Sequence, residues 1–143
     1  MGYSNKVSTT IPQNDLKKIL QTIESIDQKL PGLVSLSNEE IAALPRMKAH
    51  TESFVNECLK YSKKYPNCIP ADVDVQEINK DLMLIKSLSQ ISNALSKLKK
   101  KVEDNILLAG SEAYLPSLAI YNAVKTEEII NKHRAKKRKA VMV

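Results

Sequence analysis

Side chains that commonly hold metal ions are few and widely spaced in this sequence. It has two histidines, His50 and His133, and neither has a Glu three positions before it. A di-iron helical bundle needs that Glu, because the carboxylate and the imidazole must lie on one helix face. His50, Glu57 and Cys58 fall on one expected helix, but the two later residues lie two turns from the histidine. The sequence therefore predicts no metal site and no other cofactor.

Nucleophilic chemistry has equally little support in the residue pattern. Cys58 lies on an apolar stripe, where a free thiol packs as a small hydrophobic group. Cys68 lies in an expected loop, and no histidine or basic residue flanks it closely enough to favour a thiolate. The three glycines form neither a phosphate-binding loop nor a nucleophile elbow. These observations favour a protein that is not an enzyme.

The segment 104–125 is the most distinctive part of the sequence, because small residues gather there on an expected helix of large ones. Small side chains let two helices approach closely, and polar tips lie near the small cluster. The simpler interpretation is a tight helix crossing with tyrosines at its edge. The alternative is a polar pocket or partner surface, or an enzyme site near Glu112 and Tyr114, and its candidate residues are Ser111, Glu112, Tyr114, Tyr121 and Asn122.

Positive charge is concentrated near the C-terminus. Six cations fall within eight residues, and they are Lys132, Arg134, Lys136, Lys137, Arg138 and Lys139. The other 16 Lys and Arg equal the 16 Asp and Glu, so this run accounts for the net charge of +6. Three interpretations stay open: solvated charge, a sequence-nonspecific arm for nucleic acid, or attraction to anionic lipid. The run lacks the aromatic side chains that stack on bases.

Length and composition suit one small helical domain. The chain has 143 residues, of which 43% are hydrophobic, with one Phe and no Trp. No apolar stretch approaches the length of a membrane span, and the N-terminal residues lack the apolar region of a signal peptide. We therefore expect a cytoplasmic protein with reduced cysteines.

Hydrophobic spacing predicts four amphipathic helices. The first follows Asn14 as its N-cap and ends before Pro31 and Gly32. Ser37 opens the second helix, which is short up to Pro45, kinks or restarts there, and then runs to the loop 66–70. Asp74, with Glu77, opens the third helix along the longest apolar stripe of the chain, and the fourth helix carries Ile106, Ala109, Ala113, Ile120 and Val124 inward. Helices joined by short loops predict an all-α, up-and-down antiparallel four-helix bundle.

The end of the third long helix is open on sequence grounds. It stops either near Lys99–Lys101, with another helix starting near Asp104, or near Ala109 at the Gly110 breaker. Matching its length to the earlier helices favours the first alternative. The predicted organisation is a flexible lead over 1–12, a bundle domain over 13–131 and a disordered basic tail over 132–143.

Several short motifs resemble a family of small uncharacterised bacterial proteins. The first motif is Leu-Pro-x-Met, and it is followed along the chain by Phe-Val, a Tyr and two prolines. Two longer motifs come after these, Asp-Asn-x-Leu-Leu-Ala-Gly-Ser-Glu-Ala-Tyr and Tyr-Asn-x-Val-Lys. The matching residues are Leu44, Pro45, Met47, Phe54, Val55, Tyr61, Pro66, Pro70, 104–114 and 121–125. The resemblance implies a bacterial cytosolic helical protein and carries no activity or catalytic residue.

The function that the sequence favours is contact with other proteins. We expect a non-enzymatic helical module that binds a protein partner or forms a homo-oligomer. An accessory nucleic-acid binder using the basic run is the first alternative, and an enzyme with a small polar pocket is the second.

Overall fold

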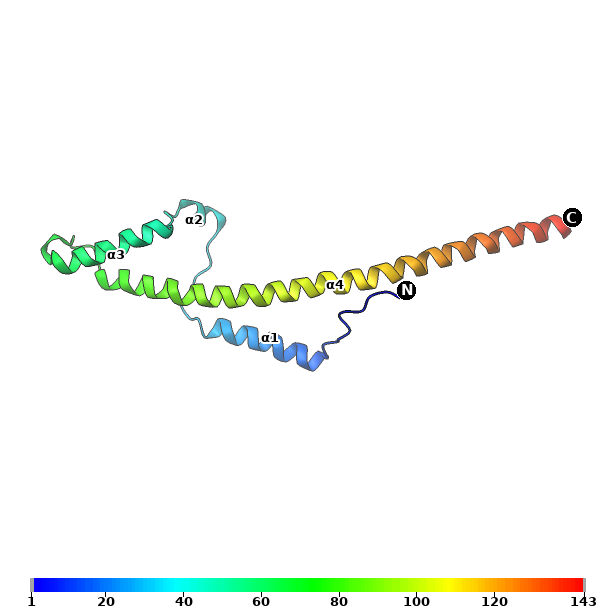
Figure 1. The fold of residues 1–143 in the computed structure, drawn as a ribbon, viewed down its shortest axis with the longest axis horizontal. Coiled ribbons are helices and arrows are strands. Elements are labelled where there is room, and N and C mark those ends of the chain that lie inside the picture. The colour runs from blue at the N-terminus through cyan, green and yellow to red at the C-terminus, as the bar shows by residue number, and fades with distance from the viewer. Residues whose placement is uncertain (1, 143) are drawn as a thin grey trace. The chain divides into compact units, whose positions relative to one another are not determined.

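The computed structural model describes residues 2–142, apart from the side chains of residues 49 and 142. The chain divides into two compact units. One comprises Ile11–Ile91, and the other comprises Met1–Thr10 together with Ser92–Val143. Helices α1 (Gln13–Gln28), α2 (Asn38–Ala43) and α3 (Ala49–Lys64), the short 3₁₀ helix η1 (Pro66–Cys68) and helix α4 (Val75–Met142) follow in that order (Figure 1). The residues described contain no strand, so the all-α prediction is confirmed.

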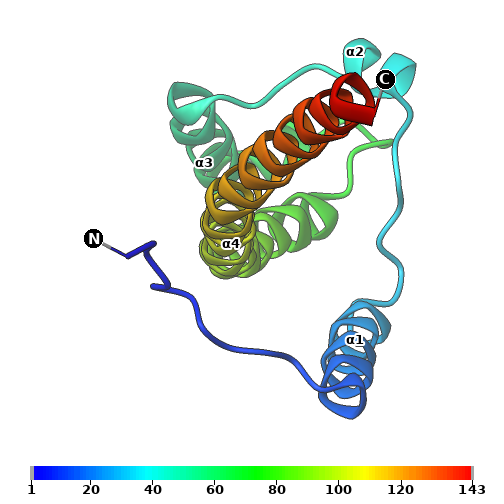
Figure 2. The same cartoon turned by 90° about the vertical axis from the view of Figure 1, so that its right-hand side faces the viewer.

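Helix α1 forms where the apolar stripe predicts it, but it begins earlier than expected. Pro12, not Asn14, occupies the N-cap position, and the N–H of Leu16 donates to the Pro12 carbonyl at 2.9 Å. Proline suits a helix entrance, because the N–H that it lacks would have no partner within the helix. In the link between α1 and α2, Gly32 adopts φ 86°, a left-handed conformation that glycine reaches without strain. Figure 2 shows the course of this link.

The start of α2 confirms a local sequence signal. The Ser37 hydroxyl accepts a hydrogen bond from the Glu40 N–H at 3.1 Å, as an N-cap does. Leu44 is extended, since the ring of Pro45 disfavours the helical conformation in the residue before it. The expected short helix and restart are therefore both observed.

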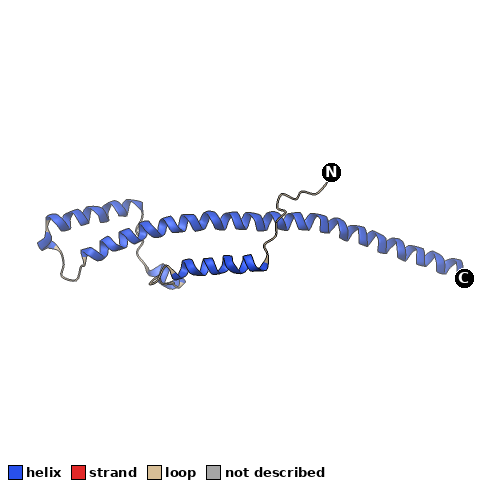
Figure 3. Cartoon of the chain, turned by 90° about the horizontal axis from the view of Figure 1, so that it is seen from below, coloured by secondary structure: helices blue, strands red, loops and turns tan. Residues whose placement is uncertain are grey.

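Helix α3, η1 and the start of α4 form a helical hairpin within the unit Ile11–Ile91. Both views show α3 beside the first turns of α4 (Figures 1 and 3). Asp74 caps α4 as predicted: its Oδ1 accepts from the Gln76 N–H at 2.9 Å and from the Glu77 N–H at 3.4 Å. The half-buried side chains of the hairpin include Val55, Leu59, Val75, Ile78 and Leu82.

Both predicted ends of the long helix are wrong, because α4 continues from Val75 to Met142. The expected break near Lys99–Lys101 is spanned by ion pairs one turn apart, Lys99–Glu103 at 3.6 Å and Lys100–Asp104 at 2.7 Å. Gly110 keeps a negative φ, and Pro116 is accommodated inside the helix. Matched helix lengths predict a break that is absent here, since one helix need not end where its neighbours do.

The prediction of a disordered tail is also corrected. Residues 132–142 continue α4 without interruption. Lysine, arginine and alanine have high helix propensities, and cations are favourable near the C-terminal end of a helix dipole. The helix propensity of residues 132–142 therefore outweighs the repulsion between their positive charges.

No side chain that the structure describes is buried in either unit. The apolar stripe of α4 illustrates this, since Leu95 is 47% exposed and Ile106 is 67% exposed. The helices are thus formed, but the apolar faces that would make a bundle core are at most half-buried. The up-and-down four-helix arrangement stays a prediction.

Candidate functional site

Glu112, a residue of the expected polar pocket, binds the N-terminal segment. Its Oε1 accepts from the backbone N–H of Lys6 at 2.8 Å, and its Oε2 accepts from that of Val7 at 3.4 Å. These groups lie 106 and 105 positions apart in the sequence, within one compact unit. The lead, expected to be flexible, is therefore held at this point by a carboxylate on α4.

A cavity of about 230 Å³ lies where the lead meets α4. Its lining combines lead residues with one face of the helix, and it comprises Tyr3, Ser4, Lys6, Leu108, Ser111, Glu112, Leu115 and Pro116. Of the five candidate residues, Ser111 and Glu112 line this cavity, whereas Tyr114, Tyr121 and Asn122 do not. The helical repeat separates them, because positions two, nine or ten residues after Glu112 lie on other sides of the helix.

The three remaining candidates face solvent. Tyr114 and Tyr121 are exposed, and Lys125 Nζ lies 5.6 Å from the centre of the Tyr121 ring. The backbone carbonyl of Asn122 accepts from the Thr126 hydroxyl at 2.8 Å, which is a contact local to the helix. The structure thus assembles no site from the five residues together, and Glu112 is occupied by backbone donors.

Replacing Glu112 by Ala should release the lead. Hydrogen bonds to a charged group contribute about 1.5–3 kcal/mol, so amide exchange at Lys6 and Val7 should accelerate by about tenfold or more. Glu128→Ala is the matched control, since that carboxylate of α4 pairs with Lys125 at 3.5 Å and not with the lead. Hydrogen exchange followed by NMR measures both variants. Unchanged exchange at Lys6 and Val7 in Glu112→Ala would contradict the contact.

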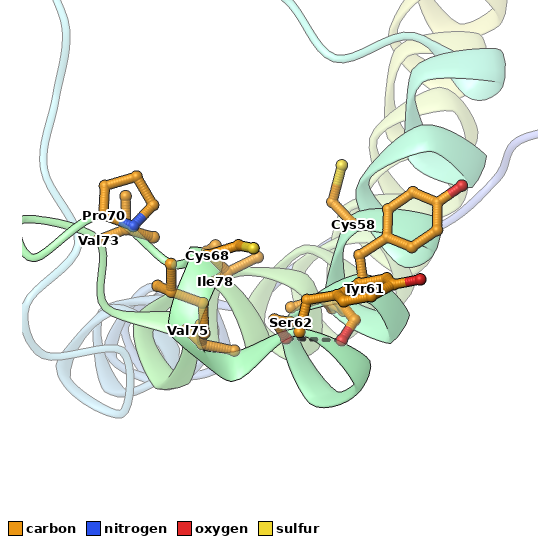
Figure 4. A pocket seen from close by; sticks show the side chains of 11 residues that line it. Cys58, Tyr61, Ser62, Cys68, Pro70, Val73, Val75 and Ile78 are labelled. Atoms are coloured by element: carbon orange, nitrogen blue, oxygen red, sulfur yellow. Dashed lines mark hydrogen bonds between the residues drawn. The ribbon is translucent and has the colours of Figure 1, made fainter.

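A second cavity, of about 360 Å³, lies in the helical hairpin (Figure 4). Its lining is mostly apolar and comprises Cys58, Leu59, Tyr61, Ser62, Tyr65, Cys68, Ile69, Pro70, Val73, Val75 and Ile78. Sequence reasoning missed this cleft, although apolar residues on both sides of the Pro66–Pro70 loop were a signal for it. We name it the hairpin cleft.

The polar groups of the hairpin cleft are engaged locally. The Ser62 hydroxyl donates to the Leu59 carbonyl at 2.6 Å, and the Tyr61 hydroxyl donates to Glu57 Oε1 at 2.8 Å. That hydrogen bond and the negative charge of Glu57 raise the pKa of Tyr61. Cys58 and Cys68 are both free and exposed, so Cys58 lies at the rim of a cleft and not in the apolar interior expected for it. The cleft therefore has the character of an apolar contact surface.

The six cations of residues 132–139 are exposed on α4. Lysines elsewhere on this helix pair with nearby carboxylates, as Lys80 does with Glu77 at 3.1 Å and Lys125 with Glu128 at 3.5 Å. No comparable pair involves residues 132–139 in the part of the chain described here. This stretch of helix is named the basic segment.

Two further properties of residues 2–142 bear on function. No group of three His, Cys, Asp or Glu side chains among them is placed to hold a metal ion. None of their helices has a stretch long and apolar enough to cross a membrane.

Comparison with known proteins gives no match. No protein family, no curated protein and no solved structure is similar to this chain at a significant level.

Proposed function

We propose that this chain is a non-enzymatic helical interaction module that assembles with a second copy of itself. The observation that carries the proposal is that no described side chain is buried, although 43% of the residues are hydrophobic. A folded chain of this size normally buries roughly two-thirds of its surface. That burial offsets the conformational entropy lost on folding, so a partner is needed to supply it.

The spacing of the α4 stripe supports a helical partner. From Val75 to Val124, fourteen steps of three or four residues average 3.5 residues per step. This is the repeat of a left-handed coiled coil, in which the stripe keeps facing another helix. The stripe comprises Val75, Ile78, Leu82, Ile85, Leu88, Ile91, Leu95, Leu98, Val102, Ile106, Ala109, Ala113, Pro116, Ile120 and Val124.

The hairpin supports an up-and-down arrangement of the assembly. Helix α3 and the start of α4 run antiparallel, and each carries half-buried side chains (Figure 1). Two such hairpins, one from each copy, supply four antiparallel helices. Each copy would then supply two of the four helices of the bundle.

A cytoplasmic location fits this proposal. Cys58 and Cys68 are free and exposed, and thiols in this state persist in reducing compartments. An enzyme site around Glu112 is disfavoured, since both carboxylate oxygens already accept backbone hydrogen bonds.

Sedimentation equilibrium of the purified full chain tests the proposal. The expected mass is twice the 16.0 kDa of one chain, with a melting temperature that rises with protein concentration. A monomer that melts cooperatively at a temperature independent of concentration would overturn it.

A further inference from the structure

Self-association does not explain what neutralises the six positive charges of residues 132–139. Beyond Glu128 the sequence contains no Asp or Glu, and the rest of the chain has no net charge. Glu128 itself lies 3.5 Å from Lys125. The basic segment therefore has no carboxylate of its own, within the described residues, to pair with.

The helical conformation also brings its like charges together. Lys132 and Lys136 are one turn apart, and so are Arg134 and Arg138. Like charges at this spacing destabilise a helix. A ligand that carries closely spaced anions would therefore relieve repulsion as well as form ion pairs, and it would stabilise the end of α4.

The angular distribution of the cations indicates the shape of that ligand. At 3.6 residues per turn, Lys132, Lys136 and Lys139 fall within an arc of about 60°. Arg134, Lys137 and Arg138 point to the other side of the helix. A helix that lies on a lipid surface needs one apolar face and one basic face, and the basic segment has cations on both sides. Its ligand must instead present anions on two sides at once.

We propose that the basic segment binds duplex DNA by entering the major groove. That groove is about 12 Å wide, admits an α-helix and is bordered by phosphates on both sides. The major groove of A-form RNA is too deep and narrow for side chains to read, so DNA is favoured over duplex RNA. Lys and Arg gain affinity by releasing counterions from phosphates, which makes the binding independent of base sequence.

Fluorescence anisotropy of the full chain with labelled duplex DNA tests the proposal. Six phosphate contacts predict a slope of about −5 for log affinity against log salt concentration. Lys136→Gln, Lys137→Gln and Arg138→Gln together should reduce the slope to about −2.7, from roughly −0.9 per contact. Glutamine has a helix propensity close to that of Lys and Arg, so circular dichroism should show the helix content unchanged.

The matched control removes the same number of charges from the middle of α4. Lys99→Gln, Lys100→Gln and Lys101→Gln should leave the salt slope unchanged, because Lys99 and Lys100 already pair with Glu103 and Asp104. Any of four results would overturn the proposal: no binding of DNA at low salt, an equal loss in the control, equal affinity for duplex RNA, or binding to phosphatidylserine vesicles in preference to DNA.

Discussion

Leu98→Asp is expected to dissociate the assembled protein into single chains. Leu98 belongs to the α4 stripe and is 57% exposed in the isolated chain, so a second copy would bury it. An unpaired charge in such an interface costs about 3–5 kcal/mol, and a symmetric pair contains the substitution twice. Sedimentation should give the mass of one chain at concentrations where the unaltered protein has twice that mass.

Leu107→Asp is the matched control for this substitution. Leu107 lies nine positions from Leu98, about 2.5 turns along α4, and therefore on the opposite face. It is 76% exposed and is not part of the stripe. The same Leu-to-Asp exchange should leave the assembly intact at this position. Equal dissociation by both variants would argue against an interface on the α4 stripe.

Pro116→Ala is expected to stabilise α4 by up to about 3 kcal/mol, the usual cost of proline inside a helix relative to alanine. Proline has no N–H, so the carbonyl of Glu112 lacks its donor four residues later. Alanine restores that hydrogen bond and removes the clash of the ring with the preceding turn. Denaturant unfolding and amide exchange in residues 110–122 measure the gain.

Gly110→Ala, on the same helix, measures how much a gain in helix propensity alone stabilises α4. A Cβ at Gly110 would meet no atom within 4 Å, so the expected gain is about 1 kcal/mol from propensity alone. Pro116 is half-buried and lines the cavity beside the lead. A loss of stability in Pro116→Ala, with a gain in Gly110→Ala, would show that the ring contacts outweigh the missing hydrogen bond.

The parts of the fold that sequence predicts are those that local chemistry decides. Ser37 and Asp74 accept hydrogen bonds from N–H groups two or three residues away, and Pro45 acts on the residue next to it. The continuity of α4 is different, since it depends on whether ion pairs such as Lys100–Asp104 outweigh a possible break. Apolar periodicity is the same for one long helix and for two shorter ones, so it could not decide between them.

The candidate site shows the same division. The small and polar residues of 104–125 correctly drew attention to Glu112, but the donors that it binds belong to Lys6 and Val7, more than 100 positions away. Backbone N–H groups occur at every residue except proline, so the sequence does not indicate which of them will bind a carboxylate. The hairpin cleft was missed because its lining comes from α3, η1, the following loop and α4 together.

The absence of buried side chains has a consequence for heat and denaturant unfolding. The heat-capacity change of unfolding and the denaturant m-value both arise from surface that is newly exposed. A single chain with no buried side chain has less surface left to expose than a compact domain of its size, so its helices should melt gradually, with smaller values of both. A sharp transition with an ordinary heat-capacity increment would belong to the assembled protein, and calorimetry would then register dissociation and unfolding as one event.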